Sequence, residues 1–152
     1  MKTFSIALAL LLTPGSNPPA RDFCTDVQML AAAAEELSPF ASLRKRDFRP
    51  NLLRDYCFAN DAGGYTCGQA LSHFGDTRDG YASRIAACLP GSTISKVGSG
   101  RPAYAVVRSK HFEARVAEHG TEFAHVGRVI TIYIASTLQR REQSKQRPRK
   151  PK

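Results

Sequence analysis

The sequence predicts an α+β domain, in which an antiparallel β-sheet is made of an N-terminal hairpin and a C-terminal β-meander. Two helices are expected to pack on one face of that sheet, and two disulfides to staple the domain. Three observations support this. Residues 56–68 contain two β-prone runs around a glycine-rich turn, helical patterns precede and follow them, and several β-prone runs fill the C-terminal half. The chain of 152 residues, 42% of them hydrophobic, has room for one core.

The first 20 residues are expected to be a signal peptide and linker. Lys2 gives a positive start, residues 4–12 form a short apolar run, and the small residue Gly15 offers a cleavage site, with Ala20 as a second choice. The apolar run is too short to cross a bilayer. A buried N-terminal helix is the alternative. Residues 21–138 then form a single disulfide-stapled α+β domain.

The first helix is expected to be capped by Asp22, Thr25 or Asp26 and to run to about Leu37, where the following Ser-Pro pair ends it. A short basic cluster follows, made of residues 44–46 and Arg49. The cluster could meet a phosphate, but acidic residues nearby offset its charge. We therefore interpret it as a solvated turn.

The hairpin pairs residues 56–59 with residues 65–68, turning through residues 60–64. Pairing about Ala62 places Cys57 directly opposite Cys67. Directly opposed residues have Cβ atoms within about 4.5–5.5 Å, which allows a cross-strand disulfide. Cys57 and Cys67 are therefore expected to be bonded to each other.

The second helix is expected to begin with Asp76 as its cap and to end near residues 89–91. Its apolar positions fall on one face, which includes Cys88 near the C-terminal end. If the hairpin cysteines pair, Cys24 must pair with Cys88 and join the two helices. Four cysteines allow three connectivities, and the sequence does not decide among them. A zinc site fits poorly, because the cysteine spacings of 33, 10 and 21 residues match no common zinc module.

Three or four strands are expected after this helix: a short, weak one at residues 93–97, and others at residues 103–109, 112–118 and 126–136. In the third, apolar residues alternate with Glu113 and Arg115, which predicts that these two side chains face solvent. The fourth contains Ile132 in a run that is apolar on both faces, as in a central strand.

Histidines are the main candidates for chemistry, since the scattered Asp and Glu residues single out no carboxylate pair. His111, His119 and His125 lie near the ends of predicted strands, and His119 with His125 could form an acid–base pair or bind a metal. No metal-ligand or hydrolase spacing accompanies them, and two disulfides leave no cysteine nucleophile. We therefore predict no catalytic residue, no metal and no cofactor.

Most of the excess charge lies in a C-terminal tail. The chain carries a net charge of +9, and residues 139–152 hold seven basic residues and one acid, whereas residues 21–138 hold 14 basic and 12 acidic residues. The tail is expected to be disordered, because it contains no apolar residue that could be buried. It could meet an anionic polymer or a membrane surface, but it has no aromatic residue for sequence-specific reading of nucleic acid. Its basic residues are Arg140, Arg141, Lys145, Arg147, Arg149, Lys150 and Lys152.

These features predict a small exported protein, periplasmic or secreted, that binds an envelope or extracellular protein without catalysis. The basic tail would act as an electrostatic tether. The alternatives are a small secreted hydrolase that uses the region of His119 and His125, or a cationic effector that acts on anionic surfaces. The sequence leaves the ligand and the oligomeric state open.

Overall fold

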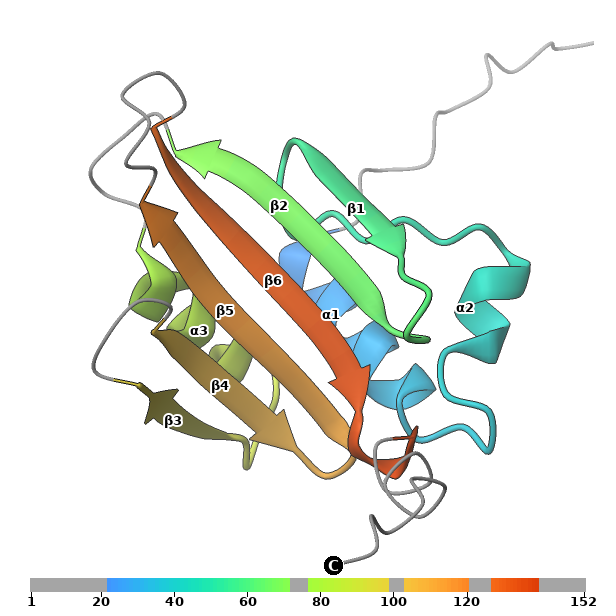
Figure 1. Cartoon of the computed structure of the whole chain (residues 1–152). Coiled ribbons are helices and arrows are strands. Elements are labelled where there is room, and N and C mark those ends of the chain that lie inside the picture. Colours follow the sequence, from blue (N-terminus) through green and yellow to red (C-terminus); the bar gives the residue numbers. More distant parts are fainter. Residues whose placement is uncertain (1–21, 72–76, 99–102, 121–126, 140–152) are drawn as a thin grey trace, which may run out of the picture.

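The fold is α+β, with a six-stranded antiparallel sheet in the order β1-β2-β6-β5-β4-β3 (Figure 1). A computed structural model describes residues 22–71, 77–98, 103–120 and 127–139. Helix α3 packs against β3, β4 and β5, and α1 lies behind β2 and β6 in the view of Figure 1. The elements in chain order are α1 (Phe23–Ala33), α2 (Ala41–Lys45), β1 (Tyr56–Ala59), β2 (Tyr65–Leu71), α3 (Arg78–Ala87), β3 (Thr93–Val97), β4 (Tyr104–Ser109), β5 (Phe112–Gly120) and β6 (Arg128–Ser136).

The two faces of the sheet differ in burial. Register places Tyr65 opposite Ile134 and Cys67 opposite Ile132, and all four of these side chains are buried in the core. The alternate residues point to the other face, which we call the open face. Its members include Tyr56, Phe58 and Tyr133, each more than two-fifths exposed. The prediction of a central strand around Ile132 is confirmed, since β6 lies between β2 and β5.

Both predicted disulfides are present. Cys57 bonds to Cys67 across the hairpin, in the expected register, and Cys24 bonds to Cys88. The second bond ties the first turn of α1 to the C-cap of α3. No cysteine in the chain is free, and disulfides of this kind persist in a non-reducing environment.

Two helix boundaries differ from prediction. Helix α1 is capped by Asp22 as expected, but it ends at Ala33, and Leu37 is fully exposed beyond it. The chain turns early because Phe40, which is buried in the core, brings its backbone N–H back to the carbonyl of Ala33. Helix α3 is capped by Thr77, whose hydroxyl accepts the Gly80 N–H at 3.0 Å. The predicted cap, Asp76, lies outside the described residues.

The basic cluster is exposed to solvent as predicted, but part of it is helical, and Glu113 is not exposed as predicted. Residues 44 and 45 end the short helix α2, which the sequence did not predict. Glu113 was expected in solvent, but it is 1% exposed. Its carboxylate accepts from Arg108 at 2.9 Å and from Arg115 at 2.8 Å. These two arginines come from neighbouring positions on the same face of the sheet, so the polar residue is buried among paired charges.

No helix within the described residues is long and apolar enough to cross a membrane. The predicted signal peptide and all basic residues of the tail fall in residues 1–21 and 140–152, outside the described parts of the chain.

Candidate functional site

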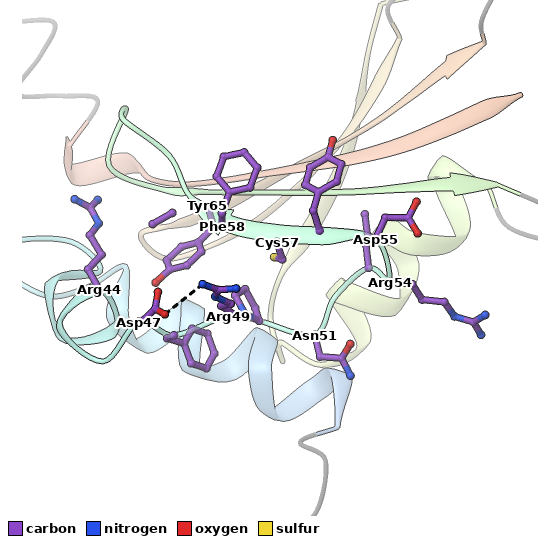
Figure 2. A pocket seen from close by; sticks show the side chains of 14 residues that line it. Arg44, Asp47, Arg49, Asn51, Arg54, Asp55, Cys57, Phe58 and Tyr65 are labelled. Atoms are coloured by element: carbon purple, nitrogen blue, oxygen red, sulfur yellow. Dashed lines mark hydrogen bonds and ion pairs between the residues drawn. The ribbon is translucent and has the colours of Figure 1, made fainter. Parts of the chain in front are cut away.

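A cleft of 710 Å³ lies beside β1, at one edge of the sheet (Figure 2). One wall is β1 itself, and the other is the stretch of residues 47–55, which we call the outer segment. Arg44 of α2 and Tyr65 of β2 complete the lining. We call this hollow the β1 cleft. It brings together aromatic, charged and backbone groups from four successive pieces of the chain.

The outer segment is held in place by its own buried residues. Phe48, Leu52 and Leu53 are buried in the core. The backbone N–H of Asn51 donates to the buried carboxylate of Asp26 on α1 at 2.6 Å. Hydrogen bonds to a charged acceptor are stronger than those between neutral groups. The segment is therefore an anchored wall, although it contains no helix or strand.

The wall made by β1 presents an unpaired backbone edge to the cleft. The N–H of Asn60 donates to the carbonyl of Gly64 at 2.9 Å, which makes these two a hydrogen-bonded pair. Pairs alternate along an antiparallel ladder, so the pair of Cys57 and Cys67 is of the non-hydrogen-bonded type, as is that of Ala59 and Tyr65. In β1 the N–H and C=O groups of Cys57 and Ala59 thus point away from β2. Among the described residues, none is hydrogen-bonded to these outward groups.

Tyr65 forms the inner end of the cleft. Its ring packs edge-on against Phe40 at 5.8 Å and Phe48 at 6.2 Å between centroids, and its side chain is fully buried. Figure 2 shows the hydroxyl directed toward Asp47 and Arg49. Burial raises the pKa of this phenol, so it stays protonated and able to donate. Within the described structure the hydroxyl has no hydrogen-bond partner, although buried tyrosine hydroxyls usually find one.

The charged lining of the β1 cleft has a small positive excess. It consists of three arginines and two aspartates, namely Arg44, Arg49, Arg54, Asp47 and Asp55. Arg44 donates one hydrogen bond to the carbonyl of Gly63 at the hairpin tip. Arg49 pairs with Asp47 at 3.4 Å, with 76% and 85% of the two side chains exposed. A pair so exposed contributes little to stability, and a better partner could displace it.

The predicted site residues do not gather in one place. The four cysteines serve as disulfides, and Cys57 is half-buried in the wall of the β1 cleft. The basic tail residues and the second member of the suggested pair, His125, lie outside the described residues. His119 is exposed, and His111 is half-buried at the start of β5. The described residues contain no group of three or more potential metal ligands.

His119 borders a smaller hollow of 420 Å³ on the open face. Tyr104, Glu113, Arg115 and Tyr133 also line it. The described lining includes no serine, no cysteine and no second histidine. Its charged groups, Glu113 and Arg115, pair with each other.

Sequence reasoning did not single out Tyr65, and it interpreted the basic cluster as a solvated turn rather than a phosphate contact. A signal for the cleft was present: β1 carries no charge and no proline, and a basic segment precedes it directly. Comparisons of the chain with protein-family models, curated proteins and solved structures give no significant match.

Proposed function

We propose that the protein is a small exported binding domain, without catalytic activity, that holds a partner in the β1 cleft. The observation that carries this proposal is the unpaired backbone edge of β1, which forms one wall of a 710 Å³ cleft. A sheet edge of this kind is a template for pairing with another chain. The partner we propose is an envelope or extracellular protein, since the two disulfides favour a non-reducing environment.

The basic tail, residues 139–152, is proposed to act as an electrostatic tether. Its net charge of six attracts anionic polymers or lipid head groups without a defined geometry. Such contacts weaken as salt rises, because the Debye length falls from about 10 Å at 0.1 M to about 3 Å at 1 M. The tether would therefore concentrate the domain near a surface, and the cleft would select the partner.

The hydrolase alternative has less support. It requires His119 to work with a second catalytic group, and the described lining around His119 offers no nucleophile. The cationic-effector alternative requires the tail alone to carry the function.

Capture of a partner from an envelope or extracellular extract tests the proposal. The bait is the mature protein, alongside Arg49→Glu, Lys45→Glu and a deletion of residues 139–152. Arg49 lines the cleft whereas Lys45 does not, and both substitutions change the charge equally. We expect Arg49→Glu to abolish capture and Lys45→Glu to preserve it.

We expect the tail deletion to weaken capture mainly at low salt. A partner held equally well by both charge variants would exclude the β1 cleft as the binding site. Complete loss of capture on deleting the tail, at every salt concentration, would favour the cationic effector.

A further inference from the structure

We infer that the β1 cleft takes an acidic peptide segment in extended conformation, which adds as a strand to β1 and places a carboxylate at the Tyr65 hydroxyl. This inference rests on the proposed binding function and names the chemistry of the ligand. Three independent observations carry it: the edge of β1, the positive excess of the cleft lining and the unpartnered buried hydroxyl.

The two edges of the sheet are protected unequally. Strand β3, at the far edge, carries Lys96, whose ammonium pairs with Asp79 on α3 at 2.7 Å. A charged lysine on an edge strand is a common guard against pairing with other chains. Strand β1 reads Tyr-Cys-Phe-Ala and has no charge and no proline. Its outward N–H and C=O groups, at Cys57 and Ala59, are those that an added strand would use.

The positive excess of the lining selects an acidic segment. Arg49 stands on the side of the cleft toward which the Tyr65 hydroxyl points (Figure 2), and Arg44 lines the cleft while bonding to the Gly63 carbonyl. Of the two aspartates that line the cleft, Asp47 pairs with Arg49 in an exposed contact. A ligand carboxylate can replace Asp47 as the partner of Arg49, because arginine matches carboxylate geometry with two parallel N–H donors.

The Tyr65 hydroxyl gives the site its depth. It is buried, protonated and without a partner in the described structure, and it points at the Asp47–Arg49 pair. When Asp47 is displaced, a ligand carboxylate paired with Arg49 can accept the hydrogen bond that this hydroxyl lacks. A hydrogen bond to a charged acceptor is among the stronger kinds, so the hydroxyl favours an acidic side chain over an amide.

The test measures binding of fluorescein-labelled heptapeptides to the full chain by fluorescence anisotropy. The probe alternates threonine and glutamate, with blocked ends. One control peptide replaces glutamate with lysine. Another keeps the glutamates but carries N-methyl groups on two adjacent central amides, which prevents strand pairing on either edge. We expect the acidic probe to bind, the lysine peptide not to bind, and N-methylation to weaken binding at least tenfold.

Protein variants separate the two contacts. Tyr65→Phe should weaken binding of the acidic probe about tenfold, the effect of losing one hydrogen bond to a charged group. Ala59→Pro removes an outward N–H that the β1–β2 ladder does not use, and it should weaken binding by a similar factor. Arg49→Gln should weaken binding at least fivefold, and the matched control Lys45→Gln less than twofold. Thermal melts of each variant check that it folds. The comparison of the two acidic peptides uses the unsubstituted protein, so it tests strand pairing even if a variant fails to fold.

Two results would overturn the inference. One is no binding of the acidic probe at millimolar concentration. The other is equal binding of the parent and N-methylated peptides together with no effect of Tyr65→Phe, which would reduce the contact to nonspecific charge attraction. Either result leaves the capture experiment with Arg49→Glu and Lys45→Glu intact. Failure of the proposed function is instead seen as equal capture by those two variants.

Discussion

The hydroxyl of Tyr65 allows an unusual prediction, a substitution that stabilises the protein while it weakens binding. In Tyr65→Phe the ring keeps its edge-on contacts with Phe40 and Phe48, at 5.8 and 6.2 Å between centroids. Only the buried hydroxyl is lost, and it has no hydrogen-bond partner in the described structure. A buried polar group without a partner costs about 1–3 kcal/mol.

We expect Tyr65→Phe to raise the free energy of unfolding by about 1 kcal/mol, the lower end of that range, since an ordered water can meet part of the demand. For a domain of this size the corresponding rise in Tm is about 4 °C. The assay is thermal unfolding followed by circular dichroism at neutral pH. Tyr133→Phe is the matched control: this side chain is 43% exposed on the open face, so its loss should change stability by no more than about 0.5 kcal/mol.

A fall in Tm for Tyr65→Phe, with Tyr133→Phe unchanged, would refute this reasoning. It would mean that the hydroxyl has a stabilising partner in the free protein, such as a tightly bound water. The hydroxyl would then not be held ready for a ligand. Equal and small effects in both variants would show that the unpartnered hydroxyl carries no measurable penalty.

Three further predictions concern the sheet and the surface. Glu113→Ala should lower the free energy of unfolding by about 1–3 kcal/mol, because it leaves Arg108 and Arg115 without their shared carboxylate. The side chains of these arginines are 47% and 40% exposed, so the loss should be smaller than for a fully buried pair. A change below about 0.5 kcal/mol in chemical denaturation would contradict it. Ile132→Asp should prevent folding, because it places an unpaired charge at a fully buried position of β6, and a native circular dichroism spectrum for this variant would exclude the assigned register. The hydrogen bond from Arg78, followed by that from Lys96, holds the pKa of Asp79 below its usual range, so its contribution is present above pH about 4 and is lost as the pH falls through the folded-state pKa. The Tm difference between the native protein and Asp79→Asn should therefore shrink on acidification from pH 6 to pH 2, and a constant difference would show that this carboxylate does not stabilise the fold.

Local signals in the sequence were sufficient for the hairpin and its register, and they made the observed disulfide geometrically possible. The turn at residues 60–64 fixes the pairing, and one register alone places Cys57 opposite Cys67. The pattern of α3 likewise placed Cys88 on the buried side. These features depend on neighbours within a few residues, which is the range over which propensity and periodicity act.

The path between residues 34 and 55 depends on longer-range packing and was not predictable in the same way. Phe40 adopts a left-handed conformation, with φ of 62°, that its residue type does not indicate. The conformation is accepted because it buries the ring against Tyr65. Tyrosine is a common residue in strands, so Tyr65 carries no special signal in the sequence. Its role emerges only when Phe40 and Phe48, distant in sequence, enclose it.

Glu113 shows a second kind of limit. Alternation of polar and apolar residues along β5 indicates which side chains share a face, and that face was assigned correctly as the one opposite the core isoleucines. The alternation does not indicate whether a given side chain on that face is exposed to solvent. Cross-strand Arg108 and same-strand Arg115 converge on the carboxylate, and charge pairing of this kind has no periodic signature.

The two disulfides brace the two walls of the β1 cleft separately. The Cys57–Cys67 bond holds the four-residue strand β1 to β2, where an edge strand so short would otherwise fray. The Cys24–Cys88 bond holds α1 to the end of α3, and α1 in turn anchors the outer segment through the contact of Asp26 with Asn51. Binding to a site that is already ordered costs less conformational entropy than binding that must order it. An exposed strand edge in a flexible protein would promote aggregation by pairing with other chains. Here β1 is fixed covalently opposite an anchored wall, and this is the arrangement in which we propose that one extended acidic segment is bound.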